Sequence, residues 1–240
     1  MLIENKVFDS DAMIIDEMIT FFAAGMKTIQ ISSTNLVYYL TKHDDIREKM
    51  LKEILPVVEK VKDNIKDGLD HDSVQDLDYF NMCYKECLRK EPPAANTINQ
   101  TVDRDTVVGT TQKFTLKKGV NFMFSIESIQ NDPIQWPEPT RFEPDRFNTS
   151  LPNNKWLLDA NGQKRNPLAF CPFFGGSRSC IGKAFAETCV RYTFPIIYHH
   201  LEFAFVDPVK QKAEKPYYSV AGSKELDCPV KVTIRNKVIR

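Results

Sequence analysis

The stretch FFGGSRSCIG at residues 173–182 constrains this chain more than any other, because it surrounds one cysteine with glycine, aromatic and arginine side chains. The sequence GKAFAETCVRYTFPIIYHH that follows has apolar residues at helical spacing, so Cys180 lies at the start of a predicted helix. The amides and dipole of a helix N-terminus favour the thiolate, which is the metal-binding form of cysteine. Gly176 and Gly182, which lack a Cβ, allow the backbone to approach a flat ligand.

The other residues of the loop suit the same chemistry. Arg178 can bind a carboxylate on the ligand through charge-assisted hydrogen bonds, and Phe173 supplies an apolar wall that keeps water from the sulfur. The alternative is a glycine-rich turn before a core helix, with an incidental buried cysteine that acts as a small hydrophobe. That alternative is the better one for a lone cysteine, although each element of the loop also suits a buried porphyrin with Cys180 as its axial ligand.

The pattern F-x-x-G-x-R-x-C-x-G, with Ala184 two residues further on, resembles the haem-binding motif of the cytochrome P450 superfamily. The resemblance implies heme b (iron protoporphyrin IX) with an axial cysteine thiolate, and Cys180 as the metal ligand. The implied cofactor-binding residues are Phe173, Gly176, Arg178, Cys180, Gly182 and Ala184.

A second motif of that family is E-x-x-R, present here as Glu86 and Arg89 on one face of a predicted helix. Alone, such a pair is equally typical of a solvated helix. Here Pro92-Pro93 follows it, as in the family, and WPEPTRFEPDRF comes later at residues 136–147. The resemblance implies that Arg146 joins Glu86 and Arg89 in a buried charge network, which specifies the fold rather than the chemistry because charges are costly to bury.

A third motif, FFAAGMKT at residues 21–28, resembles the oxygen-binding segment A-G-x-D/E-T. The resemblance implies catalytic roles for Ala24, Gly25 and Thr28: the glycine allows close approach of oxygen and haem, and the threonine hydroxyl hydrogen-bonds the oxygen. An Ala-Gly pair within a helix is otherwise a packing feature. Lys27 departs from the family, which usually has an acid there to relay protons.

The fold predicted by the hydrophobic periodicity is mainly α with a small β-sheet, and the resemblance implies the C-terminal half of the cytochrome P450 fold. Proline-studded segments between residues 131 and 166 predict an irregular loop anchored by Trp136, Phe142 and Phe147. Helices are predicted from Ser10 and Asp11 onward, over 44–61 with a kink or break at Pro56, over 77–90 and over 182–200; short strands are predicted within 97–128 and in VKVTI near the C-terminus.

The resemblance covers essentially the whole chain, and it begins at the oxygen-binding helix. We therefore expect residues 1–240 to form a single incomplete domain, the C-terminal haem-binding half, and to be a fragment of a longer protein. Half of a single-core domain leaves apolar helix faces exposed.

Charge and cysteine usage exclude several other classes of protein. Lys plus Arg and Asp plus Glu are equal at 32 each, which argues against nucleic-acid binding by bulk charge. The six cysteines form no C-x-x-C pair, which disfavours a zinc site or a disulfide framework. The apolar stretches are shorter than the ~20 residues of a membrane span, so we expect no anchor in this chain.

The function implied by the resemblance is a haem-thiolate monooxygenase that inserts one oxygen atom of O2 into a lipophilic organic substrate. Electrons would come from NADPH-cytochrome reductase or another donor, docked at Lys164, Arg165 and Lys183. The full-length protein is expected on the cytosolic face of the endoplasmic reticulum membrane. Two alternatives stay open: a haem-thiolate isomerase or dehydratase that uses no O2, favoured by Lys27, and a truncated remnant that binds no haem.

Overall fold

The computed structural model describes residues 10–61, 69, 71–109, 112–213, 217–218, 224–225 and 229–235. Helices dominate this part of the chain and the sheets are small, which confirms the predicted fold class. The α-helices are α1 (Asp11–Lys42), α2 (Asp44–Val61), α3 (His71–Gln75), α4 (Asp78–Lys90), α5 (Ile126–Gln130), α6 (Lys183–His200) and α7 (Pro208–Ala213).

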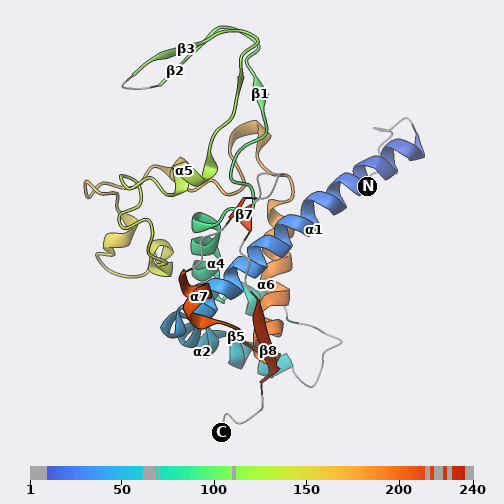
Figure 1. The fold of residues 1–240 in the computed structure, drawn as a ribbon, viewed down its shortest axis with the longest axis vertical. Helices are drawn as coiled ribbons and strands as arrows, with labels where there is room; N and C mark the ends of the chain where they lie inside the picture. Colours follow the sequence, from blue (N-terminus) through green and yellow to red (C-terminus); the bar gives the residue numbers. More distant parts are fainter. Residues whose placement is uncertain are drawn as a thin grey trace.

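Helix α1 begins where the sequence predicts, because the Ser10 side chain caps it by accepting a hydrogen bond from the Met13 amide. Its C-terminal part, from Ile31 onward, is buried, whereas its N-terminal part projects away from the other helices (Figure 1). The projecting part exposes a set of large apolar side chains: Ile15, Met18, Ile19, Phe21, Phe22 and Met26.

The hydrophobic core lies where the C-terminal part of α1 meets α2, α4 and α6. Burying each large apolar side chain contributes about 1.5–3 kcal/mol, so this cluster stabilises the arrangement of the four helices. Pro56 stands inside α2, and the helix continues to Val61, so a break at this proline is wrong. The side chains with 2% exposure or less in this core include Leu36, Leu40, Met50, Ile54, Leu77, Phe80 and Phe194.

The strands of the described residues form antiparallel pairs. Strand β2 (Thr106–Val108) pairs with β3 (Phe114–Leu116), and this hairpin forms an arm that extends from the helical body (Figure 1). The predicted C-terminal strand is confirmed as β8 (Val230–Ile234). The remaining strands are β1 (Gln100–Thr101) paired with β4 (Asn121–Phe122), β5 (Leu201–Phe205) paired with β8, and β6 (Tyr217–Tyr218) paired with β7 (Lys224–Glu225).

The segment between α5 and α6 has no regular helix or strand longer than a short 3₁₀ turn, as predicted. Trp136 and Phe142 are buried within it, and Phe147 packs against Phe170 with ring centroids 4.9 Å apart. These aromatic contacts hold the segment against α4 and bring its end to the cysteine loop. Its 3₁₀ turns are η1 (Pro144–Phe147), η2 (Lys155–Leu157), η3 (Pro167–Ala169) and η4 (Gly176–Arg178).

Among the residues that the structure describes, no helix has both the length and the apolar character needed to cross a membrane.

Candidate functional site

The cysteine loop, residues 171–182, folds back on itself between η3 and α6. The Cys180 amide donates to the Phe173 carbonyl at 2.9 Å, and the Phe174 amide donates to the Cys171 carbonyl at 2.9 Å. Gly176 adopts φ +70°, a left-handed conformation that glycine reaches without strain. Cys180 thus stands between a tight turn and the N-terminus of α6, as the sequence predicts.

The Cys180 thiol is exposed, whereas Cys83 and Cys87 are completely buried in the core. Burial raises the pKa of the Cys83 and Cys87 thiols well above the usual value, so both are poor ligands. The exposure of Cys180 argues against the interpretation of this residue as an incidental core cysteine. Cys228 lies outside the described residues.

The surroundings of Cys180 fit a flat, apolar ligand with acidic groups. Ile181 is 85% exposed, and no atom lies within 4 Å of the place where Gly176 would carry a Cβ. A Cβ on Gly182 would lie 3.8 Å from the Cys180 sulfur. Arg178 is exposed and has no ion pair within the described part of the chain. The thiol therefore stands on an exposed loop, beside one exposed apolar side chain and with a cation two residues away.

The predicted oxygen-binding residues lie on the projecting part of α1. A Cβ on Gly25 would be 3.8 Å from Cε1 of Phe185, so α1 approaches the first turn of α6 just beyond the cysteine loop. The Thr28 hydroxyl donates to the Ala24 carbonyl at 2.8 Å, which occupies its hydrogen within the helix and leaves its oxygen as an acceptor. The predicted oxygen-binding segment thus contacts the helix that follows the cysteine loop, through the Phe185 ring.

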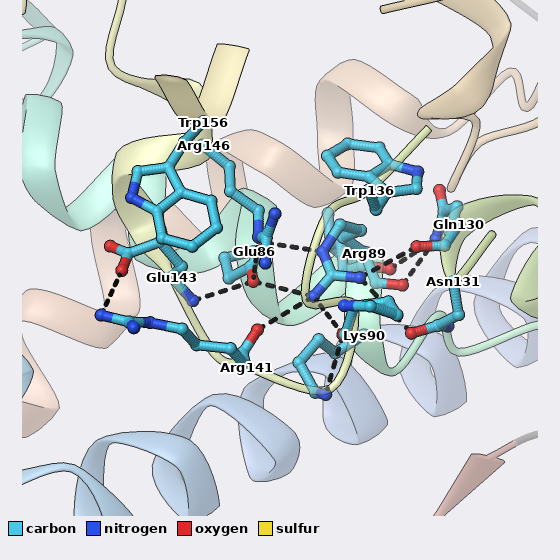
Figure 2. Close-up of polar contacts among 12 residues, drawn as sticks. Glu86, Arg89, Lys90, Gln130, Asn131, Trp136, Arg141, Glu143, Arg146 and Trp156 are labelled. Carbon is cyan, nitrogen blue, oxygen red and sulfur yellow. Dashed lines mark hydrogen bonds and ion pairs between the residues drawn. The ribbon is translucent and has the colours of Figure 1, made fainter. Parts of the chain in front are cut away.

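Glu86, Arg89 and Arg146 meet in a fully buried charge network (Figure 2). The Glu86 carboxylate receives the Arg89 guanidinium in a bidentate pair, with Nε–Oε2 at 2.7 Å and Nη2–Oε1 at 2.9 Å. Arg146 Nε lies 3.3 Å from Glu86 Oε1, and the Glu143 amide donates to the same oxygen. Burial lowers the pKa of Arg146, and the Glu86 charge opposes that effect. One carboxylate thus faces two guanidinium groups.

The network extends into the segment that precedes the cysteine loop. Arg89 donates to the carbonyls of Gln130 and Pro139, both at 2.9 Å. The Trp136 indole donates to the Ala169 carbonyl at 3.3 Å. These bonds fix the path of residues 130–170. The charge network thereby helps to position the start of the cysteine loop.

Arg165, one of the three residues predicted to dock a reductase, is instead part of this scaffold. Its guanidinium stacks on Trp136 at 3.7 Å and donates to the carbonyls of Gln135 and Trp156. Burial lowers its pKa to about 10. The structure therefore favours a structural role for Arg165, whose Nε and Nη2 donate within the chain, whereas Lys164 and Lys183 are exposed.

A cavity of about 270 Å³ lies between α4, the cysteine loop and α6, and Cys180 is part of its lining. The charged residues that line the same cavity are three basic ones, Lys85, Lys183 and Arg191, and one acidic one, Glu187. Sequence reasoning missed Lys85 and Arg191. Their separation in sequence gives no sign of their proximity, which arises only when α4 packs beside α6.

The chain combines a mainly helical body with an exposed cysteine on the loop directly before α6, and the comparisons with known proteins give the family. The family model described as Cytochrome P450 matches residues 4–226, so the chain belongs to the cytochrome P450 family. Proteins of this family carry a haem with a cysteine thiolate ligand, and many are monooxygenases.

Curated relatives resemble this chain at moderate identity. Cytochrome P450 6B1 of Papilio polyxenes is 34% identical over 185 residues, which are 75% of this chain and 34% of that protein. Cytochrome P450 4F12 of Homo sapiens is 30% identical over 194 residues, 81% of this chain and 34% of that protein. Cytochrome P450 4F5 of Rattus norvegicus is 30% identical over 207 residues, 86% of this chain and 36% of that protein. The chain therefore spans about a third of the length of these relatives.

Proposed function

We propose that Cys180 is the axial thiolate of a haem, and that this chain forms the cysteine-bearing part of a monooxygenase acting on a lipophilic organic substrate. The observation that carries the proposal is the exposed Cys180 thiol, held by the Cys180–Phe173 backbone bond directly before α6. Bound haem supplies the iron that activates O2, and a thiolate ligand donates electron density that favours O–O cleavage.

The other residues of the loop have separate tasks in this proposal. Arg178 binds a carboxylate of the cofactor, Phe173 shields one side of the sulfur, and Gly176, Gly182 and Ala184 leave room for the ring. On α1, the small size of Ala24 and Gly25 leaves room beside the helix for oxygen and substrate to meet. The Thr28 oxygen accepts a hydrogen bond there, since its own hydrogen bonds the Ala24 carbonyl.

Electrons are proposed to arrive from NADPH-cytochrome reductase or another donor at the basic cavity beside Cys180. Lys85 and Lys183 line that cavity, whereas Arg165 and Arg191 donate to neighbouring groups of the chain. An acidic surface on the donor complements this group and speeds encounter more than it adds affinity. The location of the full-length protein at the endoplasmic reticulum membrane stays a prediction.

Haem titration of the chain tests the proposal. Wild type is compared with Cys180→Ala and with the matched control Cys189→Ala, which removes a half-buried thiol on α6. We expect the reduced carbon monoxide complex of wild type and control to show a thiolate-ligated absorption spectrum, and Cys180→Ala to lose it. A wild-type chain that takes up no haem supports the remnant alternative and overturns the proposal, as does an unchanged spectrum in Cys180→Ala.

A further inference from the structure

Gln130, the last residue of α5, is completely buried and uses every polar atom of its side chain (Figure 2). Its Nε2 donates to the carbonyls of Leu88 at 2.9 Å and Arg89 at 3.1 Å. Its Oε1 accepts from the Cys171 amide at 2.9 Å. A buried amide with all its bonds made is rigid, because each alternative orientation leaves buried groups unsatisfied.

The side-chain nitrogen of Gln130 caps the C-terminal end of α4. Helix α4 runs to Lys90, so the carbonyls of Leu88 and Arg89 belong to its last turn and lack partners within the helix. Gln130 supplies the missing donors. Its backbone carbonyl in turn accepts from Arg89 Nη1 at 2.9 Å, which ties α5 to the charge network.

The other side of Gln130 reaches Cys180 through the backbone of the cysteine loop. Cys171 donates to Gln130, its carbonyl accepts from Phe174, and the neighbouring Phe173 carbonyl accepts from Cys180. The three bonds are each 2.9 Å long. No charged group takes part in this series of hydrogen bonds. Its geometry therefore depends on the orientation of the side-chain carbonyl of Gln130, whose oxygen is Oε1.

We propose that Gln130 is a positioning residue that couples the Glu86–Arg89–Arg146 network to the cysteine loop and thereby sets the place of the Cys180 sulfur. The part of this inference that concerns a haem ligand rests on the proposed function. The part that concerns the loop does not, because it can be measured on the chain alone.

The test uses Gln130→Leu, which keeps the volume and removes every side-chain bond, and Gln130→Glu. The matched control is Gln135→Leu, which removes the bond from the Asn166 amide to Gln135 Oε1 but leaves Cys171 untouched. The first measurement is hydrogen exchange at the Cys171 and Cys180 amides of the chain without haem. Gln130→Leu should speed exchange at Cys171 by about tenfold, the effect of one lost hydrogen bond, and speed it less at Cys180.

Gln130→Glu separates positioning from general stability. A protonated carboxyl group accepts as the amide oxygen does but donates one hydrogen bond in place of two, so the Glu variant should lie closer to wild type than Gln130→Leu while its carboxyl is protonated. Once ionised, it faces the carbonyls of Leu88 and Arg89 with a negative charge, and protection at Cys171 should fall. The inference is overturned if exchange at Cys171 in Gln130→Leu stays at the wild-type rate, or rises equally throughout the chain; where Gln130→Leu does not fold, the pH profile of the Glu variant decides.

The second measurement is the spectrum of the haem-loaded chain. Gln130→Leu should reduce the thiolate-ligated fraction severalfold, and Gln135→Leu should leave it unchanged. If wild type itself gives no thiolate spectrum, the proposed function fails while the exchange data still decide the role of Gln130 in the loop. A full thiolate spectrum in Gln130→Leu would overturn the coupling to the ligand.

Discussion

Replacing Glu86 by Gln tests whether one carboxylate holds the charge network together. Glutamine keeps the size of the side chain and removes the carboxylate that both guanidinium groups face, so Arg89 and Arg146 keep two positive charges at full burial. Three short contacts to guanidinium nitrogens, at 2.7, 2.9 and 3.3 Å, lose their ionic component. Breaking a buried ion pair on one side costs about 3–5 kcal/mol.

Urea unfolding followed by far-ultraviolet circular dichroism measures this cost. With a slope of about 2 kcal/mol per molar urea, the Glu86→Gln midpoint should fall by about 2 M. The control is Lys117→Gln, which breaks an exposed ion pair to Asp105 at 2.7 Å and should leave the midpoint where it is. A Glu86→Gln midpoint no lower than that of the control would refute the inference that the charge network stabilises the folded chain.

Further predictions concern three other polar or ionisable groups. Glu53 caps α4 by accepting from the amides of Tyr79 and Phe80, both at 2.8 Å, so Glu53→Ala should lower the free energy of unfolding by about 1 kcal/mol in urea titrations, and Glu53→Gln by less. Burial raises the pKa of Glu53, so its contribution is fullest below the unfolded value and declines as pH rises through the folded pKa; unfolding measured from pH 4 to 7 should lose this component in Glu53→Gln. Burial, followed by the Glu91 charge, raises the pKa of Tyr39, so stability should fall as pH rises above about 10, and Tyr39→Phe should fall less steeply. Iodoacetamide should alkylate Cys180 well before Cys83 and Cys87, as followed by peptide mass spectrometry, and similar rates at all three would contradict their assigned burial.

The helices could be predicted because their signals are local. Ser10 is a capping residue in front of an apolar periodicity, and the proline pair after Lys90 stops α4. Strand β5 was not predicted, because LEFAF continues the apolar run of α6 without a turn residue between them. It becomes a strand through pairing with β8, some thirty residues later, and such a distant partner leaves no local mark.

The same difference between local and distant signals applies to the candidate site. Cys180 and its glycines stand within one short stretch, so their pattern alone predicts a ligand loop. Gln130 carries no pattern, since a glutamine at the end of a short helix is ordinary in sequence. Its importance comes from three elements that converge on it, namely the last turn of α4, the Arg89 side chain and the Cys171 amide.

The two parts of the candidate site, the cysteine loop and the segment of α1, are therefore held by different kinds of interaction. Buried hydrogen bonds connect the cysteine loop, through Gln130, to the fully buried charge network. The segment with Ala24, Gly25 and Thr28 lies on the projecting part of α1, where Phe21, Phe22 and Met26 are exposed and the nearest neighbour is the Phe185 ring. Since polar networks have few alternative arrangements while exposed apolar faces have many, a change in the network should alter the place of the Cys180 sulfur before it alters α1. Hydrogen exchange along α1 in Glu86→Gln, compared with exchange at Cys171 and Cys180, measures this order, and faster exchange in residues 11–30 than in the cysteine loop would reverse it.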